Sequence, residues 1–558
     1  MAEAAPTAEQ ALPKNEVVVV GGGLVGCLCA VLLQRSKRFK VTIYERYSDM
    51  RNIPSLGRSI NLVMTRRGLK AAELLQIKEE LCALSVKVLG RSMWLQKSVL
   101  PENSNSSAPE DTSSAPEDGK PKAEITHTQV FQKYGREEDC NYSVSRYELN
   151  CFLLREAERL GVTVNFGHRL KKADFTTDEG KTTLVFEVDV AKNGTSEDLR
   201  QETAADAKAP TTTTELKTVN LGANVPVFGC DGGPSGVRYS LKEQGFLTFT
   251  EEILGQSYRE IMFPKAKAGG YCMEASALHI WPRRTHMLMG LADRGGTFTG
   301  TLYVDNDAWP KTKEEAEKFF DENYSTAVPL AGGMDSCCEQ LLQKPPGLLG
   351  TVRTSKFNLD GRCVLVGDSA HAIVPFFGQG CNCGFEDCVI LDQIMQEKLP
   401  AEADAEITFK DWQKIFEAFH EQRKPSADAI ANLALENFVE MRELVGDIQF
   451  LKAKHVEKTL EMKIPEQFRS RYSLVCYGSA TRGNLTYANA YALGTTIKEV
   501  IGEIVDKVEA EQGSAYVYDG EPPETQTALV LKYGEPLVQE KVKPRLVQLG
   551  MDLSQIYA

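Results

Sequence analysis

The sequence of 558 residues predicts an α/β fold for one part of the chain; because a separate antiparallel sheet is also expected, the whole chain is α+β. Three observations predict it. A strand–turn–helix–strand pattern occupies residues 17–45, and a second strand–turn–helix pattern begins at 363. Between them, short apolar runs over 245–305 alternate with turns, which is typical of an antiparallel sheet. After 395 the apolar residues recur at helical spacing, so helices are expected there.

The composition is that of a globular protein, with 42% hydrophobic and 25% charged residues. The 64 Lys and Arg against 77 Asp and Glu give a formal net charge of −13. This balance argues against a nucleic-acid partner or a constitutive membrane surface, because both require a broad basic face. The 14 cysteines lack paired C-x-x-C spacing, so reduced thiols and no metal site are expected.

One apolar run near the N-terminus has two interpretations. Residues 17–34 contain no charge, and 18 residues is close to the minimum for a transmembrane helix. Three consecutive glycines, 21–23, interrupt the run and favour a turn between a buried strand at 17–20 and a helix at 24–35. A second strand at 40–44 completes a compact βαβ unit.

Within this unit, Gly21, Gly23 and Gly26 form a G-x-G-x-x-G motif between strand and helix, and Glu45 follows 24 positions after Gly21. The glycines allow a pyrophosphate to approach the backbone, and the acid can accept hydrogen bonds from a ribose. A Rossmann-like dinucleotide-binding domain is therefore expected, the alternative being a glycine-rich packing turn. The carboxylate would repel a 2′-phosphate, which favours FAD or NAD over NADP.

Two later motifs favour FAD. Asp368 ends a strand and can hold a ribityl hydroxyl, and the loop 375–380 leads into a helix near Asn382. Backbone N–H groups at such a helix start can stabilise the negative charge of a reduced flavin. Asp231-Gly232 is weak evidence alone, since most Asp-Gly pairs are simple turns. Its position between the other two motifs increases its weight.

The order of these three motifs resembles that of the single-component (group A) flavin monooxygenases. The resemblance narrows to the members that act on kynurenine through six segments: 57–62, 143–146, 278–283, 367–380, 384–388 and 437–442. It implies an FAD-dependent, NADPH-consuming enzyme that uses O2 to convert L-kynurenine to 3-hydroxykynurenine through a flavin C4a-hydroperoxide. The reaction belongs to tryptophan degradation towards quinolinate and NAD synthesis.

The resemblance also implies which residues bind the substrate. The carboxylate-binding Arg corresponds to Arg91, and the neutral hydrogen-bonding partners correspond to Tyr134, Asn437 and Tyr472. Arg can bind a carboxylate with two parallel hydrogen bonds, and the other three residues would fix the orientation of the substrate. Taken singly, the Arg could be a surface ion-pair residue, the tyrosines core aromatics and the Asn a helix-surface amide.

For the cofactor, the resemblance adds residues from every part of the Rossmann-like domain. The wall facing the reacting ring is expected at Pro375, Phe376, Phe377 and Gly378, the predicted catalytic loop. His371 and His279 are expected to be structural, because the ring amine activates the substrate and no side-chain base is needed. Together with the three motif glycines, the cofactor set is Val25, Ile43, Tyr44, Glu45, Arg46, Arg58, Val63, Arg146, Leu170, Asp231, Asp368, Cys381 and Asn382.

The expected domain organisation is interleaved. A discontinuous FAD-binding domain comprises 15–80, 140–240 and 351–395, and a substrate-binding sheet domain comprises 81–139 and 241–350. A C-terminal helical region follows at 396–500. The polar segments 101–124, which contains SSAPED twice, and 191–219 are expected to be disordered insertions.

Alternatives to this assignment remain within and outside the enzymes. A group A hydroxylase for another aromatic acid would share every motif, whereas a non-catalytic FAD-fold binding protein would keep only the glycine motif. The expected partner is a small-molecule substrate, and the sequence does not indicate an oligomeric state. The resemblance implies the cytosolic face of the mitochondrial outer membrane, but residues 484–558 contain no apolar anchor, so a cytoplasmic location is the alternative.

Overall fold

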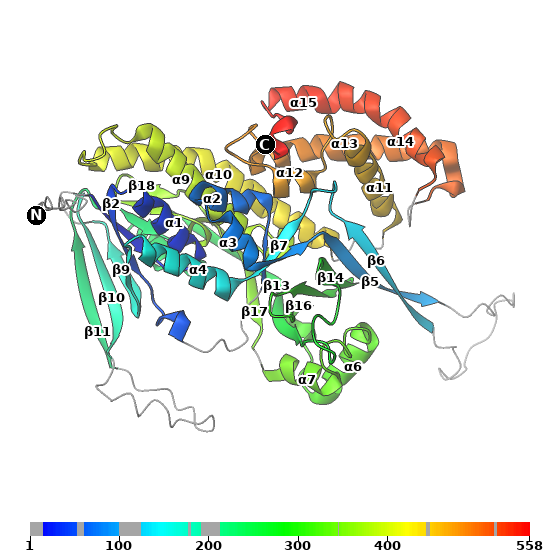
Figure 1. Ribbon diagram of the computed structural model, residues 1–558, viewed down its shortest axis with the longest axis horizontal. Helices are drawn as coiled ribbons and strands as arrows, with labels where there is room; N and C mark the ends of the chain where they lie inside the picture. The colour runs from blue at the N-terminus through cyan, green and yellow to red at the C-terminus, as the bar shows by residue number, and fades with distance from the viewer. Residues whose placement is uncertain are drawn as a thin grey trace, which may run out of the picture.

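The computed structural model describes residues 15–52, 61–99, 124–176, 180–190, 213–343, 345–441, 447–517 and 522–557. It contains two large sheets, two small sheets and a set of C-terminal helices (Figure 1). The predicted mixed α/β fold is confirmed.

A mainly parallel six-stranded sheet forms the centre of the Rossmann-like part. The uncharged run 17–34 forms strand β1 and helix α1, which are buried almost throughout, and it is not a membrane span. Helix α1 packs against α4 and α9, so the sheet is covered by helices whose apolar faces supply the core. The strand order is β18 (Asn358–Leu359), β19 (Cys363–Leu365), β12 (Val227–Gly229), β1 (Asn15–Val20), β2 (Phe39–Tyr44) and β8 (Thr163–Asn165). The helices of this part are α1 (Leu24–Arg35), α2 (Arg66–Leu75), α3 (Lys78–Ala83), α4 (Arg146–Arg159), α5 (Gly236–Glu243), α8 (Asp368–His371) and α9 (Gly380–Lys398).

Two three-stranded sheets adjoin this centre. One pairs β3 (Asn61–Met64), β7 (Asn141–Ser145) and β4 (Ser85–Val88), and the other pairs β11 (Thr213–Leu221), β10 (Thr182–Val190) and β9 (His168–Asp174). Strand β11 corrects the expected insertion at 191–219, because 213–219 pair along β10 in continuous antiparallel register. Residues 191–212, and 101–123 of the other expected insertion, lie outside the described residues, and Glu124 begins strand β6.

The second large sheet has seven strands and is antiparallel except where β5 pairs with β14. Helices α6 (Lys313–Tyr324) and α7 (Met334–Gln343) pack on it through a core that includes Trp281 and Phe320. Figure 1 shows these helices on the side of the sheet away from the C-terminal helices. The strand order is β17 (Gly347–Thr354), β13 (Phe249–Phe263), β16 (Phe298–Asp305), β15 (His286–Ala292), β14 (Ala277–Arg283), β5 (Gly90–Val99) and β6 (Glu124–Lys133).

The helical pattern predicted after 395 is confirmed, and it continues to the end of the described chain. Helix α10 contains Pro425 and packs against both α9 and α13, which joins the C-terminal helices to the Rossmann-like part. None of the helices in the described residues combines the length and apolarity needed to span a bilayer. The helices are α10 (Phe409–Val439), α11 (Ile448–Lys463), α12 (Arg471–Tyr477), α13 (Tyr487–Gln512), α14 (Glu524–Leu537) and α15 (Lys543–Gln548).

Candidate active site

A cavity of about 1040 Å³ lies between the two large sheets. One side of it is formed by the glycine turn after β1, the ends of β2 and β12, and the start of α8. The other side is formed by Met289 and Leu291 of β15 and Thr299, Thr301 and Tyr303 of β16. The loop 375–381 borders it as well. The cavity therefore joins the Rossmann-like part to the antiparallel sheet.

The glycine turn has a backbone that other residues could not adopt without strain. Gly21 has φ +106°, and a Cβ there would lie 2.4 Å from the carbonyl oxygen of Cys230. A Cβ on Gly26 would lie 2.0 Å from the carbonyl oxygen of Gly21. Helix α1 begins directly after this turn, with no side-chain cap and no acidic residue in its first turn. Its free N–H groups therefore suit an anionic group such as a pyrophosphate.

Glu45 supports the same turn from the end of β2. Its Oε2 accepts a hydrogen bond from the Gly22 N–H at 2.6 Å, and its Oε1 accepts one from the Tyr47 N–H at 2.9 Å. Each carboxylate oxygen has a further lone pair, and Glu45 lines the cavity. The residue predicted to hold a ribose thus also holds the glycine turn in position.

Asp231 provides a test of whether the cavity suits FAD. Its Oδ2 accepts a hydrogen bond from the Val237 N–H at 3.1 Å, whereas its buried Oδ1 has no partner among the described residues. Burial raises the pKa of this carboxyl group, which indicates an incompletely compensated site. A hydroxyl of a dinucleotide cofactor would supply the missing donor. Together with the glycine turn and Asp368 on the cavity wall, these residues fit FAD.

Most of the predicted cofactor residues line this cavity, and three lie behind its wall. Gly26 and Ile43 pack beneath the surface, and Asn382 holds the wall together by donating to the carbonyl oxygens of Val63 and Gly378, both at 2.8 Å. Arg58 lies outside the described residues. The predicted residues on the wall are Gly21, Gly23, Val25, Tyr44, Glu45, Arg46, Val63, Arg146, Leu170, Asp231, Asp368 and Cys381.

Several wall residues were not predicted from the sequence. Asn150 donates to the carbonyl oxygen of Gly22 at 3.0 Å, and Arg169 lies on the wall near the end of β2. Neither belongs to a motif, so only the packing of α4 and β9 against the glycine turn reveals them. Cys381 is on the wall, and burial raises the pKa of its thiol to about 12, which keeps it protonated and weakly nucleophilic.

The predicted catalytic loop has two faces. Pro375 and Gly378 line the cavity, whereas Phe376 and Phe377 point into the core of the C-terminal helices. The Phe376 ring lies 4.4 Å from that of Phe438. The Phe377 ring stacks on Tyr472 with 5.8 Å between centroids. The two phenylalanines therefore support the wall from behind, contrary to the expectation that all four residues form it.

The predicted substrate residues gather behind this loop. The Arg91 guanidinium packs over the rings of Tyr134 and Tyr472, at 5.7 and 4.9 Å from their centroids, and these two rings stack at 5.5 Å. Asn437 donates to the carbonyl oxygen of Phe376 at 2.7 Å. None of the four lines the cavity in this structure. Tyr134 nevertheless packs in one small apolar cluster with Val63 and Leu291, which do line it, so one layer of side chains separates the two regions.

Three residues that contact Tyr472 each have a buried polar atom with no hydrogen-bond partner among the described residues. These atoms are Nε of Arg91, Oδ1 of Asn141 and the hydroxyl oxygen of Tyr477. Asn141 uses its amide nitrogen to donate to the Tyr472 hydroxyl at 3.0 Å. Unpaired buried polar atoms are costly and rare, so three in one region indicate a place for a polar ligand. Asn141 and Tyr477 carried no motif signal, and only tertiary packing brings them here.

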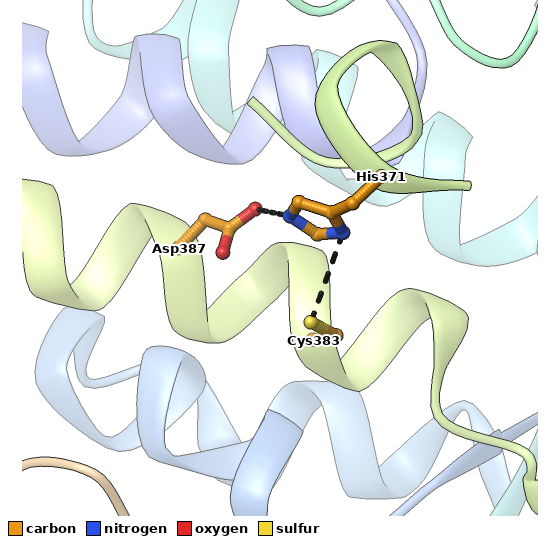
Figure 2. Close-up of side chains that lie close together, drawn as sticks. All are labelled: His371, Cys383 and Asp387. Atoms are coloured by element: carbon orange, nitrogen blue, oxygen red, sulfur yellow. Dashed lines mark hydrogen bonds and ion pairs between the residues drawn. The ribbon is translucent and has the colours of Figure 1, made fainter. Parts of the chain in front are cut away.

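His371, Cys383 and Asp387 lie close enough together to be considered as metal ligands, as Figure 2 shows. Arg423, however, donates to Asp387 Oδ1 at 2.8 Å and lies 3.3 Å from the sulfur of Cys383. Although burial disfavours the imidazolium, the Asp387 carboxylate keeps the pKa of His371 well above its usual range. The Arg423 guanidinium, which is paired with Asp387 at this site, would repel a metal cation. This cluster is a buried ion-pair network.

Comparison with known proteins agrees with this geometry. The family described as FAD binding domain matches residues 14–433. A 2-methyl-3-hydroxypyridine-5-carboxylic acid oxygenase has a similar fold, with a TM-score of 0.53 at 16% identity over 80% of this chain and 95% of that chain. Klebsiella pneumoniae HpxO, solved with FAD and uric acid, has a TM-score of 0.50 at 16% identity over 80% and 93% of the two chains. The family match and the cavity thus define an FAD-binding protein, and its fold is similar to that of a known oxygenase.

Curated relatives narrow the class. Kynurenine 3-monooxygenase of Myxococcus xanthus is 34% identical over 88% of this chain and 91% of its own length. The Stenotrophomonas maltophilia protein of the same name is 34% identical over 82% and 86%. This chain belongs to the kynurenine 3-monooxygenase family of FAD-dependent aromatic hydroxylases, and it is an enzyme. Both relatives are bacterial and therefore give no support to a mitochondrial location.

Proposed function

We propose that the protein hydroxylates L-kynurenine to 3-hydroxykynurenine, with FAD as its cofactor, NADPH as reductant and O2 as oxygen donor, in tryptophan degradation towards NAD synthesis. The observation that carries the proposal is the Arg91 cluster, one side-chain layer from a cavity that fits FAD. The family membership agrees with this assignment.

The chemistry of the unpaired atoms around Tyr472 supports an α-amino acid as substrate. The N–H at Arg91 Nε is a donor that suits a carboxylate. The amide oxygen of Asn141 is an acceptor that suits an ammonium group, and the Tyr477 hydroxyl can serve either group. An α-amino acid carries both charges on one carbon, so one end of the kynurenine molecule offers a partner for each kind of unpaired atom.

The aromatic ring of the substrate would then point from this cluster towards the cavity. Bound FAD supplies the activation of oxygen. The amine on the substrate ring activates the neighbouring carbon, so the protein needs no general base there. The buried histidines His279 and His371 therefore need no catalytic role. We infer that Pro375 and Gly378 shape the reacting space, while Phe376 and Phe377 keep the wall rigid and exclude water.

The direct test uses the purified flavoprotein with NADPH, O2 and L-kynurenine. We expect kynurenine to accelerate NADPH oxidation and to yield a product heavier by one oxygen atom. The same assay with the analogue that lacks the α-amino group tests the role of the ammonium site, and a panel of other aromatic acids tests the alternative substrates. The substrate assignment fails if kynurenine is not consumed. A preparation without flavin would favour a non-catalytic binding protein.

Replacing Arg91 by alanine is expected to raise the KM for kynurenine at least about tenfold, or about 1.4 kcal/mol, because the carboxylate loses its only proposed cationic partner. Steady-state kinetics with varied kynurenine measures this effect. Arg353→Ala is the matched control, since Arg353 lies on β17 and bonds to Asn432 and Asp428. An unchanged KM in Arg91→Ala would remove this residue from the substrate site.

Replacing Tyr477 by phenylalanine is expected to weaken kynurenine binding about fivefold without lowering the melting temperature, because the hydroxyl has no partner to lose in the ligand-free protein. Kynurenine titration followed by flavin absorbance and a thermal melt measure the two effects. Tyr324→Phe is the control with the opposite expected result, because the Tyr324 hydroxyl lies 2.7 Å from His286 Nδ1 and its ring belongs to the separate core beneath α6 and α7. That variant should lose stability and keep its affinity. A stability loss in Tyr477→Phe would refute the interpretation.

A further inference from the structure

Two adjacent carboxylates on helix α9, Glu386 and Asp387, are almost fully buried, with 3% and 0% of their surfaces exposed. Burial of two neighbouring acidic side chains is costly unless both are paired. Arg423 of α10 pairs with both of them, at 2.9 Å from Glu386 Oε2 and 2.8 Å from Asp387 Oδ1. Their remaining hydrogen bonds go to different parts of the molecule.

Asp387 holds the cofactor side. Its Oδ2 accepts a hydrogen bond from the Gly367 N–H at 2.9 Å and lies 2.7 Å from Nε2 of His371 (Figure 2). These two groups mark the start and the end of α8, a helix of four residues that is too short to be stable alone. The first residue of α8 is Asp368, which lines the cavity. Asp387 therefore ties both ends of α8, and with them the backbone at Asp368, to α9.

Glu386 holds the substrate side. Its Oε1 accepts hydrogen bonds from Arg67 Nη1 at 2.6 Å and from the Ala480 N–H at 3.0 Å. Arg67 in turn donates to the carbonyl oxygens of Leu474 and Val475, at 3.0 and 2.8 Å. These carbonyls belong to α12, the short helix that carries Tyr472 against Arg91. Glu386 therefore fixes α12 through Arg67.

We infer that Glu386 and Asp387 are positioning residues that align the two halves of the active site from one turn of α9, Asp387 acting on the FAD side through α8 and Glu386 acting on the kynurenine side through α12. That the two carboxylates position α8 and α12 follows from the buried hydrogen-bond network alone. That α12 serves kynurenine binding rests on the proposed function.

The test compares Asp387→Asn with Glu386→Gln in the purified holoenzyme. Release of FAD on dilution is followed by the recovery of flavin fluorescence, and kynurenine affinity by flavin absorbance. Hydrogen–deuterium exchange of peptides covering 367–372 and 471–478 reports on each helix without any substrate. Asp392→Asn is the matched control, because Asp392 is a buried carboxylate on α9 that pairs with Arg35 instead.

We expect a crossed result. Asp387→Asn should release FAD about tenfold faster and exchange faster at 367–372, with kynurenine affinity within about threefold of the wild type. Glu386→Gln should weaken kynurenine binding about tenfold and exchange faster at 471–478, with FAD release within about threefold. Asp392→Asn should change none of the four measurements by more than about threefold.

Equal changes in all measurements for both variants would overturn the inference, since they would indicate only a general loss of stability. The inference also fails if neither peptide exchanges faster. If a carboxylate variant does not fold, His371→Leu and Arg67→Lys test the same two contacts without leaving a carboxylate position altered. His371→Gln keeps a donor towards Asp387, so it should release FAD as slowly as the wild type. Wild-type enzyme that does not bind kynurenine would refute the proposed substrate, while the FAD and exchange results would still decide the inference.

Discussion

Replacing Arg423 by leucine is expected to lower the free energy of unfolding by about 3–5 kcal/mol, the largest stability loss predicted for a single side chain of this protein. Arg423 is fully buried and is bonded to Glu386, Asp387 and the carbonyl oxygen of Cys383. Leucine would fill much of the volume but would leave two buried carboxylates with one fewer cation between them. Breaking such a network costs more than its formation contributes, because the remaining charges stay buried.

Urea unfolding followed by far-ultraviolet circular dichroism measures the loss of stability. Arg353→Leu is the matched control, since Arg353 lies on the neighbouring strand β17 and its side chain is 23% exposed. Its ion pair with Asp428 is 3.8 Å long and should contribute about 0–1 kcal/mol. Equal losses of unfolding free energy in the two variants would show that the buried network contributes no more to stability than an exposed ion pair.

Replacing Gly21 by alanine is expected to yield protein that retains almost no FAD. The φ of +106° is strained for any residue with a Cβ, and the added Cβ would meet the backbone of Cys230 and Asp231 at 2.4 to 2.8 Å. Backbone atoms cannot move aside as a flexible side chain can, so the turn and the start of α1 would shift. The flavin-to-protein ratio after purification measures the outcome, and a thermal melt of the cofactor-free protein measures the strain.

Gly23→Ala separates this strain from the effect on the cofactor. Gly23 has a negative φ of −74°, and a Cβ there would meet no atom of the protein within 4 Å. The cofactor-free Gly23→Ala variant should therefore melt at the temperature of the wild type, whereas Gly21→Ala should melt several degrees lower. Wild-type flavin content in Gly21→Ala would contradict the expected role of this turn.

Local sequence signals identified the Rossmann-like part correctly. The uncharged run is a strand and a helix because three glycines interrupt it, and a tight turn between elements is a local property of the chain. The end of the second insertion was predicted wrongly. Residues 213–219 are polar and threonine-rich, but they form a strand because β10 offers them a complete antiparallel partner. Propensity cannot reveal a partner that is distant in the sequence.

In the candidate site, too, some features could be predicted from the sequence and others depended on tertiary packing. Resemblance led to Arg91, Tyr134, Asn437 and Tyr472, and the structure brings three of these four, Arg91 and the two tyrosines, into direct contact. The resemblance did not distinguish two kinds of residue in the loop 375–378. Pro375 and Gly378 face the cavity, whereas Phe376 and Phe377 face the helices. The direction of a side chain in a short loop depends on the elements packed around it. No pattern along the chain contains that information.

By itself, then, the sequence determined the mixed fold class, the family and the turns that suit FAD, because strand, turn and helix signals depend on neighbouring residues. Only the tertiary structure decided which atoms remain unpaired around Tyr472 and how Glu386 and Asp387 divide their contacts. Hydrogen-bond partners and burial arise when segments hundreds of residues apart pack together. The desolvation that gives these polar groups their energetic weight exists only in the folded protein.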